Sequence, residues 1–220
     1  MKQYITKAEN GFVDASWLNG IKDSLNGGKV LFHIYTGISD REVLIALMNT
    51  LREAIPSCNV VGTESGGEIR EGSLMDKGIL ISCLVFESTE ISVRIYDGLA
   101  GQERLIGSRI KEEIDGEVLH DLKAAELLLP GALLNTLDMY EELKHCDPSV
   151  VIFGGYAGNH DADLENAFVM ADGKTYMNAC VAILYYGKDF RIDAAESAGW
   201  EKLGMPFKIT SAEGNLLREI

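Results

Sequence analysis

Apolar runs and amphipathic segments follow one another in a regular order in the first half of the chain. Residues 29–35 are apolar and rich in β-branched and aromatic side chains, which predicts a strand. An amphipathic helix with Ser39 as its N-cap is expected next, and a short apolar strand over 58–61 then ends at Gly62. Alternating apolar residues over 77–96 predict a long hairpin after this unit.

The second half of the chain shows the same order of elements. We expect a strand over 124–129, a helix over 134–146 and a second strand over 150–153. A glycine-rich loop over 154–159 follows, and residues 169–192 again supply hairpin strands. This alternation predicts an α/β fold in which mixed sheets pack against helices.

The two halves also share residues at one constant offset. A helix end, a helix stop and two glycines recur in register, which favours an internal duplication with halves at about 29–98 and 124–195 of a single domain. The alternative is that any two strand-helix-strand units converge on the same stops and turn glycines. The matched residues are Leu51-Arg52 with Leu143-Lys144, Pro56-Ser57 with Pro148-Ser149, Gly62 with Gly154, and Gly66 with Gly158.

Each strand-helix-strand unit ends with a strand, and a polar loop directly follows that strand in both units. Ligands of such sheets gather beyond the carboxyl ends of parallel strands, so we expect the two loops to face one another across a small polar pocket. Each loop taken alone is also compatible with a plain turn, and Gly66 and Gly158 with a purely structural role that holds the sheets close together. The expected ligand-binding residues are Thr63, Glu64, Ser65, Gly66, Gly67, Glu68, Gly154, Gly155, Tyr156, Ala157, Gly158 and Asn159.

The loop residues indicate which ligand would suit this pocket. Neither a P-loop nor a G-x-G-x-x-G motif is present, and Glu64 and Glu68 would repel phosphate and attract an ammonium group. Backbone N–H groups would bind a carboxylate, so a zwitterion such as an amino acid fits best. Glu68 is equally compatible with a solvated strand edge or an ion pair.

Composition and charge exclude several classes of function. The formal net charge is −14, with 20 basic and 34 acidic residues, which argues against binding to nucleic acid or to an anionic membrane surface. No apolar run approaches the roughly 18 residues of a membrane span, and the first residues lack a signal-peptide core, so we expect a cytoplasmic protein. The cysteines are far apart and are expected to be small buried hydrophobes.

Catalytic and metal-binding signals are weak. Ser65 lies in G-x-x-S-G instead of G-x-S-x-G, and no pattern ties a histidine to it, which argues against a serine hydrolase. The histidines show no i, i+4 pair of the kind that binds a metal on a helix. His160 directly follows the second glycine loop and is the histidine best placed for a ligand contact, although a plain loop surface explains it equally.

Three motifs together resemble a known family. They are S-G-G-E-I at 65–69, G-G-x-A-G at 154–158, and a C-terminal run with the pattern G-W-x3-G-x-P-x3-T-x3-G-N from Gly199 to Asn215. In this order they resemble the N-terminal half of the FIST sensory domain (FIST N), over about residues 29–219.

The resemblance implies a role in signal transduction. FIST domains are input modules ahead of diguanylate cyclase (GGDEF), histidine kinase or chemoreceptor outputs, and the resemblance implies a small-molecule ligand such as an amino acid. Some members bind haem as gas sensors, which here would use His160 or His33 as the iron ligand; otherwise no cofactor is expected. We expect this chain itself not to be an enzyme. Its expected partners are a C-terminal FIST half, an output domain and, in a homodimer, a second copy.

Overall fold

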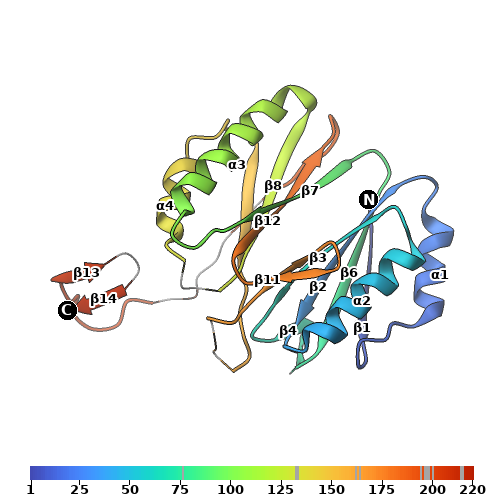
Figure 1. Cartoon of the computed structure of the whole chain (residues 1–220), viewed down its shortest axis with the longest axis horizontal. Helices are drawn as coiled ribbons and strands as arrows, with labels where there is room; N and C mark the ends of the chain where they lie inside the picture. Colours follow the sequence, from blue (N-terminus) through green and yellow to red (C-terminus); the bar gives the residue numbers. More distant parts are fainter. Residues whose placement is uncertain are drawn as a thin grey trace.

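The structure is a computed structural model, and it describes residues 1–75, 77–131, 134–161, 163, 165–193, 195, 199, 201–213 and 216–220. Trp200, Gly214 and Asn215 of the C-terminal motif lie outside the described residues. The described residues form a mixed α/β fold in which helices cover two stacked sheets (Figure 1).

The first sheet has six strands in the order β1-β6-β2-β3-β10-β11. Neighbouring strands are antiparallel except β2 and β3, which are parallel. Helices α1 (Ala15–Ser24) and α2 (Arg41–Ala54) pack on its outer face. The strands are β1 (Lys2–Ala8), β2 (Lys29–Thr36), β3 (Cys58–Glu64), β6 (Ile79–Phe86), β10 (Val169–Ala171) and β11 (Lys174–Tyr176).

The second sheet has four strands in the order β7-β12-β8-β9. Only β8 and β9 are parallel. Helices α3 (Glu103–Glu117) and α4 (Thr136–Leu143) cover its outer face, and a 3-10 turn, η1 (Val118–His120), follows α3. The strands are β7 (Glu90–Asp97), β8 (Leu122–Leu129), β9 (Val151–Tyr156) and β12 (Ala179–Tyr186).

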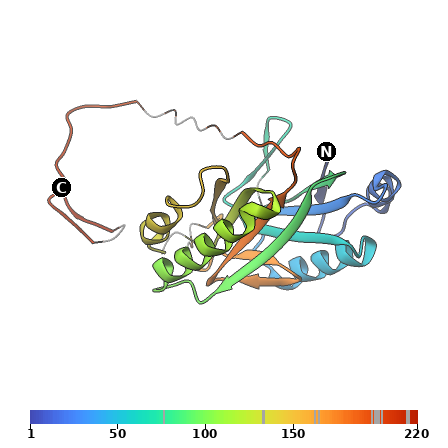
Figure 2. The same ribbon diagram turned by 90° about the horizontal axis from the view of Figure 1, so that it is seen from above.

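The two sheets pack face to face, so the molecule has four layers in the order helix, sheet, sheet, helix (Figure 1 and Figure 2). Successive side chains of a strand point to opposite faces. In β2, Phe32 packs against α1 and α2 whereas Leu31 packs between the sheets. In β8, Leu127 packs against α3 and α4 whereas Leu128 packs between the sheets. These strands are buried on both faces, which explains their nearly continuous apolar sequences.

The order and direction of elements repeat between the sheets. Strands β1-β6-β2-β3 correspond to β7-β12-β8-β9, and α1 and α2 correspond to α3 and α4. Gly62 lies opposite Ile34, and Gly154 lies opposite Leu127, on the neighbouring parallel strand. A Cβ at either glycine would clash with the carbonyl oxygen of that opposite residue, so both glycines allow the same close approach. The origin of the repeat by duplication stays a prediction.

The prediction of a hairpin over residues 77–96 is wrong. Its two strands, β6 and β7, belong to different sheets and do not pair with each other. Alternating apolar residues show that one face of a strand is buried but do not identify its partner. The repeat therefore starts at β1 and at β7, one strand and one helix earlier than the sequence pattern suggested.

Two helix ends also differ from expectation. The N-cap of α2 is Asp40, whose Oδ1 accepts hydrogen bonds from Glu42 N at 3.1 Å and Val43 N at 3.2 Å, so Ser39 is free for another contact. The helix expected over 134–146 is shorter, at Thr136–Leu143.

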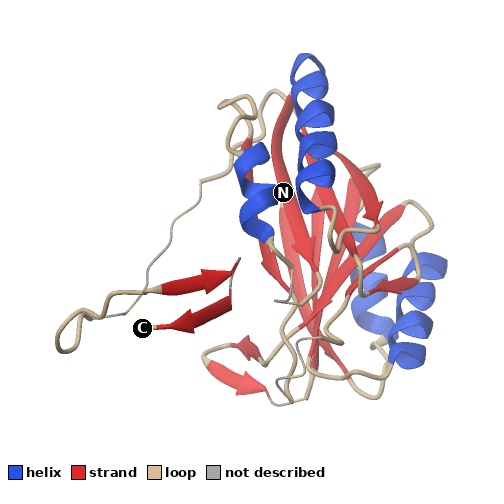
Figure 3. Cartoon of the chain, turned by 60° about the vertical axis from the view of Figure 1, so that its left-hand side comes forward, coloured by secondary structure: helices blue, strands red, loops and turns tan. Residues whose placement is uncertain are grey.

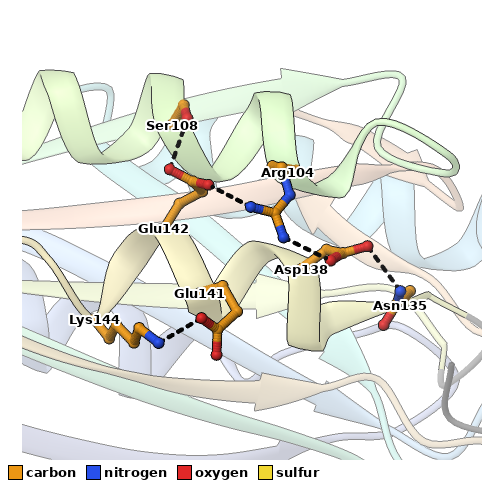
Figure 4. A network of polar contacts seen from close by, with 7 residues as sticks. All are labelled: Arg104, Ser108, Asn135, Asp138, Glu141, Glu142 and Lys144. Carbon is orange, nitrogen blue, oxygen red and sulfur yellow. Dashed lines mark hydrogen bonds and ion pairs between the residues drawn. The ribbon is translucent and has the colours of Figure 1, made fainter.

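A polar network joins α3 to α4 along their exposed sides (Figure 4). Arg104 donates to Asp138 Oδ1 and to Glu142 Oε1, each at 3.1 Å, and Ser108 Oγ donates to Glu142 Oε2 at 3.0 Å. Such exposed pairs orient side chains and contribute little to stability.

Two small hairpins lie outside the main sheets. One, β4 (Glu68–Arg70) with β5 (Ser73–Met75), directly follows the first glycine loop. The other, β13 (Ser211–Glu213) with β14 (Leu216–Glu219), lies apart from the two-sheet body (Figure 3). Within the part of the chain that the structure describes, no helix is long and apolar enough to cross a membrane.

Candidate functional site

The two glycine loops lie side by side although they are far apart in the sequence. Gly158 N donates to Glu64 O at 2.9 Å, and Asn159 Nδ2 donates to Glu64 Oε1 at 2.9 Å. A Cβ at Gly158 would lie 2.8 Å from Gly66 N, so glycine is required for this close approach. The loops therefore face one another, and Gly158 has the structural role that the sequence left open.

Both loops line one cavity of about 760 Å³, which we call the glycine-loop cavity. It lies where the first sheet meets the second, and Tyr35, Glu126 and Leu128 form its inner wall. Eight of the expected ligand-binding residues line it: Thr63, Glu64, Ser65, Gly66, Gly154, Gly155, Tyr156 and Gly158. Four do not line it: Gly67, Glu68, Ala157 and Asn159.

Glu64 is the most buried acidic residue of the site, with 1% of its surface exposed. Its Oε1 accepts hydrogen bonds from Ser39 Oγ at 2.5 Å and from Asn159 Nδ2. Its Oε2 has no hydrogen-bond partner among the described residues. Burial raises the pKa of Glu64, although the bonds from Ser39 and Asn159 and the charge of Arg41 oppose this effect. The site therefore contains a carboxyl group that is not fully satisfied by the protein.

Glu68 has a supporting role in this structure. It is 3% exposed, and its Oε1 accepts a hydrogen bond of 2.6 Å from Ser65 Oγ. Ser65 Oγ also accepts from Gly67 N at 3.3 Å, so the two residues fix the turn of the first loop. Glu68 is thus neither a solvated strand edge nor a residue of the cavity wall.

A second buried polar cluster lies beside this cavity and was not predicted from the sequence. His33 Nε2 lies 3.0 Å from Glu126 Oε2, and Tyr185 donates to the same oxygen at 2.6 Å. Burial alone would raise the pKa of Glu126, but the hydrogen bond and charge of His33, with the Tyr185 hydroxyl, hold it below its usual value. Burial and then Glu126 raise the pKa of Tyr185. The sequence signal for this cluster is a charged residue, Glu126, inside the apolar run K-A-A-E-L-L-L.

The residues considered for chemistry are not arranged as a catalytic or metal site. Ser65 Oγ is bonded to Glu68, and the contacts of the described residues include no bond between Ser65 and a histidine. His160 is half-buried and is not among the residues that line the glycine-loop cavity. The described residues contain no group of three or more His, Cys, Asp or Glu side chains able to hold a metal. Cys83 and Cys180 are buried as expected, whereas Cys58 and Cys146 are half-buried.

The fold and site define a class of protein: an α/β domain whose two sheets repeat the same order of elements, with a cavity lined by both sheets and without an assembled catalytic group among the described residues. The family model of the FIST N domain matches residues 30–220, so the chain belongs to the FIST N family. FIST N domains are sensory domains of signal-transduction proteins, and this is the general role of the chain. No curated protein matches the chain in a comparison of sequences.

Proposed function

We propose that this chain is a cytoplasmic, non-catalytic input domain that binds a small molecule bearing an ammonium group, such as an amino acid, in the glycine-loop cavity. Binding regulates an attached output domain, of which a diguanylate cyclase or a histidine kinase are the two candidate types.

The negative charge of the cavity wall is the main support for this proposal. Three acidic residues line the cavity, namely Glu64, Glu126 and Asp193, and the described lining residues include no Lys, Arg or His. A wall of this composition attracts a cation and disfavours phosphate. The buried carboxylate of Glu64, whose Oε2 has no hydrogen-bond partner among the described residues, attracts the ammonium group.

A donor for a ligand carboxylate is present in the same cavity. Gly66 lines it, and the N–H of Gly66 forms no hydrogen bond with the described residues. In contrast, Ser65 N and Gly158 N already donate to Thr36 O and Glu64 O. One unengaged N–H beside a group of carboxylates suits a zwitterion better than a simple amine.

The position of the cavity supports a role in signalling. Ile192, Asp193 and Ala195 line it, and the chain continues from them to the C-terminal hairpin. A ligand therefore contacts the segment that leads from the two-sheet body to the C-terminal hairpin, and preferential binding to one arrangement of this segment shifts its population.

Haem is not part of the proposal. His33 is 4% exposed and its Nε2 is engaged with Glu126, so that nitrogen is not open to iron. His160 does not line the cavity. The residues that the resemblance offered as iron ligands therefore do not fit haem.

Isothermal titration of the full chain with the common amino acids tests the proposal. We expect saturable binding of at least one of them and about tenfold or greater weakening by Glu64→Gln, which removes the charge and retains the size. Glu112→Gln on the exposed side of α3 is the matched control and leaves binding unchanged. Absence of binding by every amino acid to the folded wild-type protein overturns the proposal.

A further inference from the structure

A second cavity, of about 610 Å³, lies between the two sheets on the other side of Glu126, and we call it the intersheet cavity. It shares Tyr35, Glu126, Phe153 and Ile192 with the glycine-loop cavity. His33 lines only the intersheet cavity. The site therefore extends beyond the region that the glycine loops enclose.

Aromatic rings that belong to strands of both sheets line this cavity. From the first sheet, His33 and Tyr35 are stacked with ring centroids 6.1 Å apart and an interplanar angle of 8°. From the second sheet, Tyr185 stacks on Phe190 with centroids 5.4 Å apart and an angle of 3°, and Phe153 lies 6.3 Å from Tyr185. A cavity wall rich in aromatic rings favours a flat ligand that presents its face or edge to them.

The carboxylate of Glu126 gives the cavity a buried hydrogen-bond acceptor. Its Oε2 accepts from both His33 and Tyr185, whereas its Oε1 forms no hydrogen bond with the described residues. Glu126 as a whole is only 8% exposed, but its Oε1 atom is not completely buried. An acceptor in apolar surroundings that is left unpaired strongly favours a ligand donor.

The remaining charges of the wall limit the ligand further. Glu87 and Asp189 are acidic, and the single Arg of the described lining, Arg191, donates through its Nη1 to the carbonyls of Lys188 and Phe190. Arg191 keeps its positive charge and Met1 carries an N-terminal ammonium group, but the carboxylates of Glu87, Glu126 and Asp189 outnumber them, so the charge of the wall disfavours an anionic aromatic compound.

We propose that the intersheet cavity binds a neutral or cationic planar aromatic molecule whose N–H or O–H donates a hydrogen bond to Glu126 Oε1. Indole and phenol are the simplest molecules of this class. The intersheet cavity adjoins the proposed amino-acid site and shares four lining residues with it, but its test does not depend on that function.

Calorimetric titration of the full chain with indole and with 1-methylindole tests this assignment. The two probes have nearly the same shape, but only indole carries the N–H donor. We expect saturable binding of indole and about tenfold or greater weaker binding of 1-methylindole, which corresponds to the loss of one hydrogen bond to a charged acceptor. Equal affinities, or no saturable binding of indole, overturn the proposal.

Substitutions locate the bound probe. In Glu126→Gln the amide oxygen keeps the position that accepts from His33 and Tyr185, so the amide NH2 replaces the Oε1 acceptor and the preference for indole is lost. Phe190→Ala, which alters only the intersheet cavity, weakens indole binding, whereas Tyr156→Ala, which alters the glycine-loop cavity, leaves it unchanged. The reverse pattern overturns the proposal.

Glu64→Gln separates this site from the proposed amino-acid site. We expect this variant to bind indole as the wild type does, even if no amino acid binds either protein. If Glu126→Gln does not fold, the two indoles on the wild type and the Phe190→Ala variant still decide the question.

Discussion

His33 Nε2 lies 3.0 Å from Glu126 Oε2 and thereby joins the central strand β2 of one sheet to β8 of the other. The two side chains are 5% and 11% exposed, so the pair is largely shielded from solvent. An interaction of this kind fixes how the two sheets stack, and its contribution to stability depends on the charge of Glu126.

Stability at acid pH tests the role of Glu126. Its folded-state pKa lies below the ordinary value of 4.5, so its charge stabilises the fold above that pH and this contribution is lost as the pH falls through the folded-state pKa. We expect Glu126→Gln to lower the unfolding free energy by about 1–3 kcal/mol at neutral pH. Urea unfolding of both proteins should show this difference shrinking as the pH falls below the ordinary pKa. Glu112→Gln is the control, and a difference that does not change with pH contradicts the argument.

The sequence predicted the position of the glycine loops because parallel strands impose it. Once β2-α2-β3 and β8-α4-β9 were recognised, the carboxyl ends of the strands had to lie at the sheet edges where Ser65 and Gly158 are found. The FIST N assignment rested on the same loops together with the C-terminal motif from Gly199 to Asn215, and it is confirmed by the family match.

The contacts among His33, Glu126 and Tyr185 could not be predicted from the sequence. His33 and Glu126 are separated by 93 residues, and each looked like a single polar residue in an apolar strand. Their pairing depends on which faces of the two sheets meet, and the wrong hairpin over 77–96 hid that arrangement. Glu68 was placed in the cavity wall because loop position does not reveal side-chain direction, and its bond to Ser65 directs it elsewhere.

Glu64 is expected to show the opposite dependence on pH. Burial raises its pKa above 4.5, so its ionisation destabilises the fold, and the penalty appears as the pH rises from that value through the folded-state pKa. Glu64→Gln should therefore stabilise the ligand-free protein at neutral pH, on the order of 1 kcal/mol, with no difference in acid. Urea unfolding at several pH values measures this, with Glu112→Gln as the control. A less stable Glu64→Gln protein at neutral pH contradicts the assigned direction of the pKa shift.

The contact between the glycine loops can be tested with one methyl group. A Cβ at Gly158 would lie 2.8 Å from Gly66 N, so Gly158→Ala should force the loops apart and cost about 1–3 kcal/mol. A Cβ at Gly155 meets nothing within 4 Å, so Gly155→Ala in the same cavity wall is the matched control. Thermal unfolding should show a melting temperature lower by about 2–4 °C per kcal/mol for Gly158→Ala alone. Equal melting temperatures for both variants would show that the loops do not need this close approach.

The close packing of α3 on α4, away from the candidate site, can also be tested with glycine-to-alanine substitutions. A Cβ at Gly107 would lie 2.9 Å from Met139 O, whereas a Cβ at Gly116 in the same helix meets nothing within 4 Å. Gly107→Ala should separate the helices and lower the unfolding free energy by about 1–3 kcal/mol, despite the higher helix propensity of alanine. Gly116→Ala keeps only the gain in propensity and should raise the unfolding free energy by up to about 1 kcal/mol. The two substitutions thus have opposite signs in urea unfolding, and stabilisation by both would mean that α4 does not pack on α3 at Gly107.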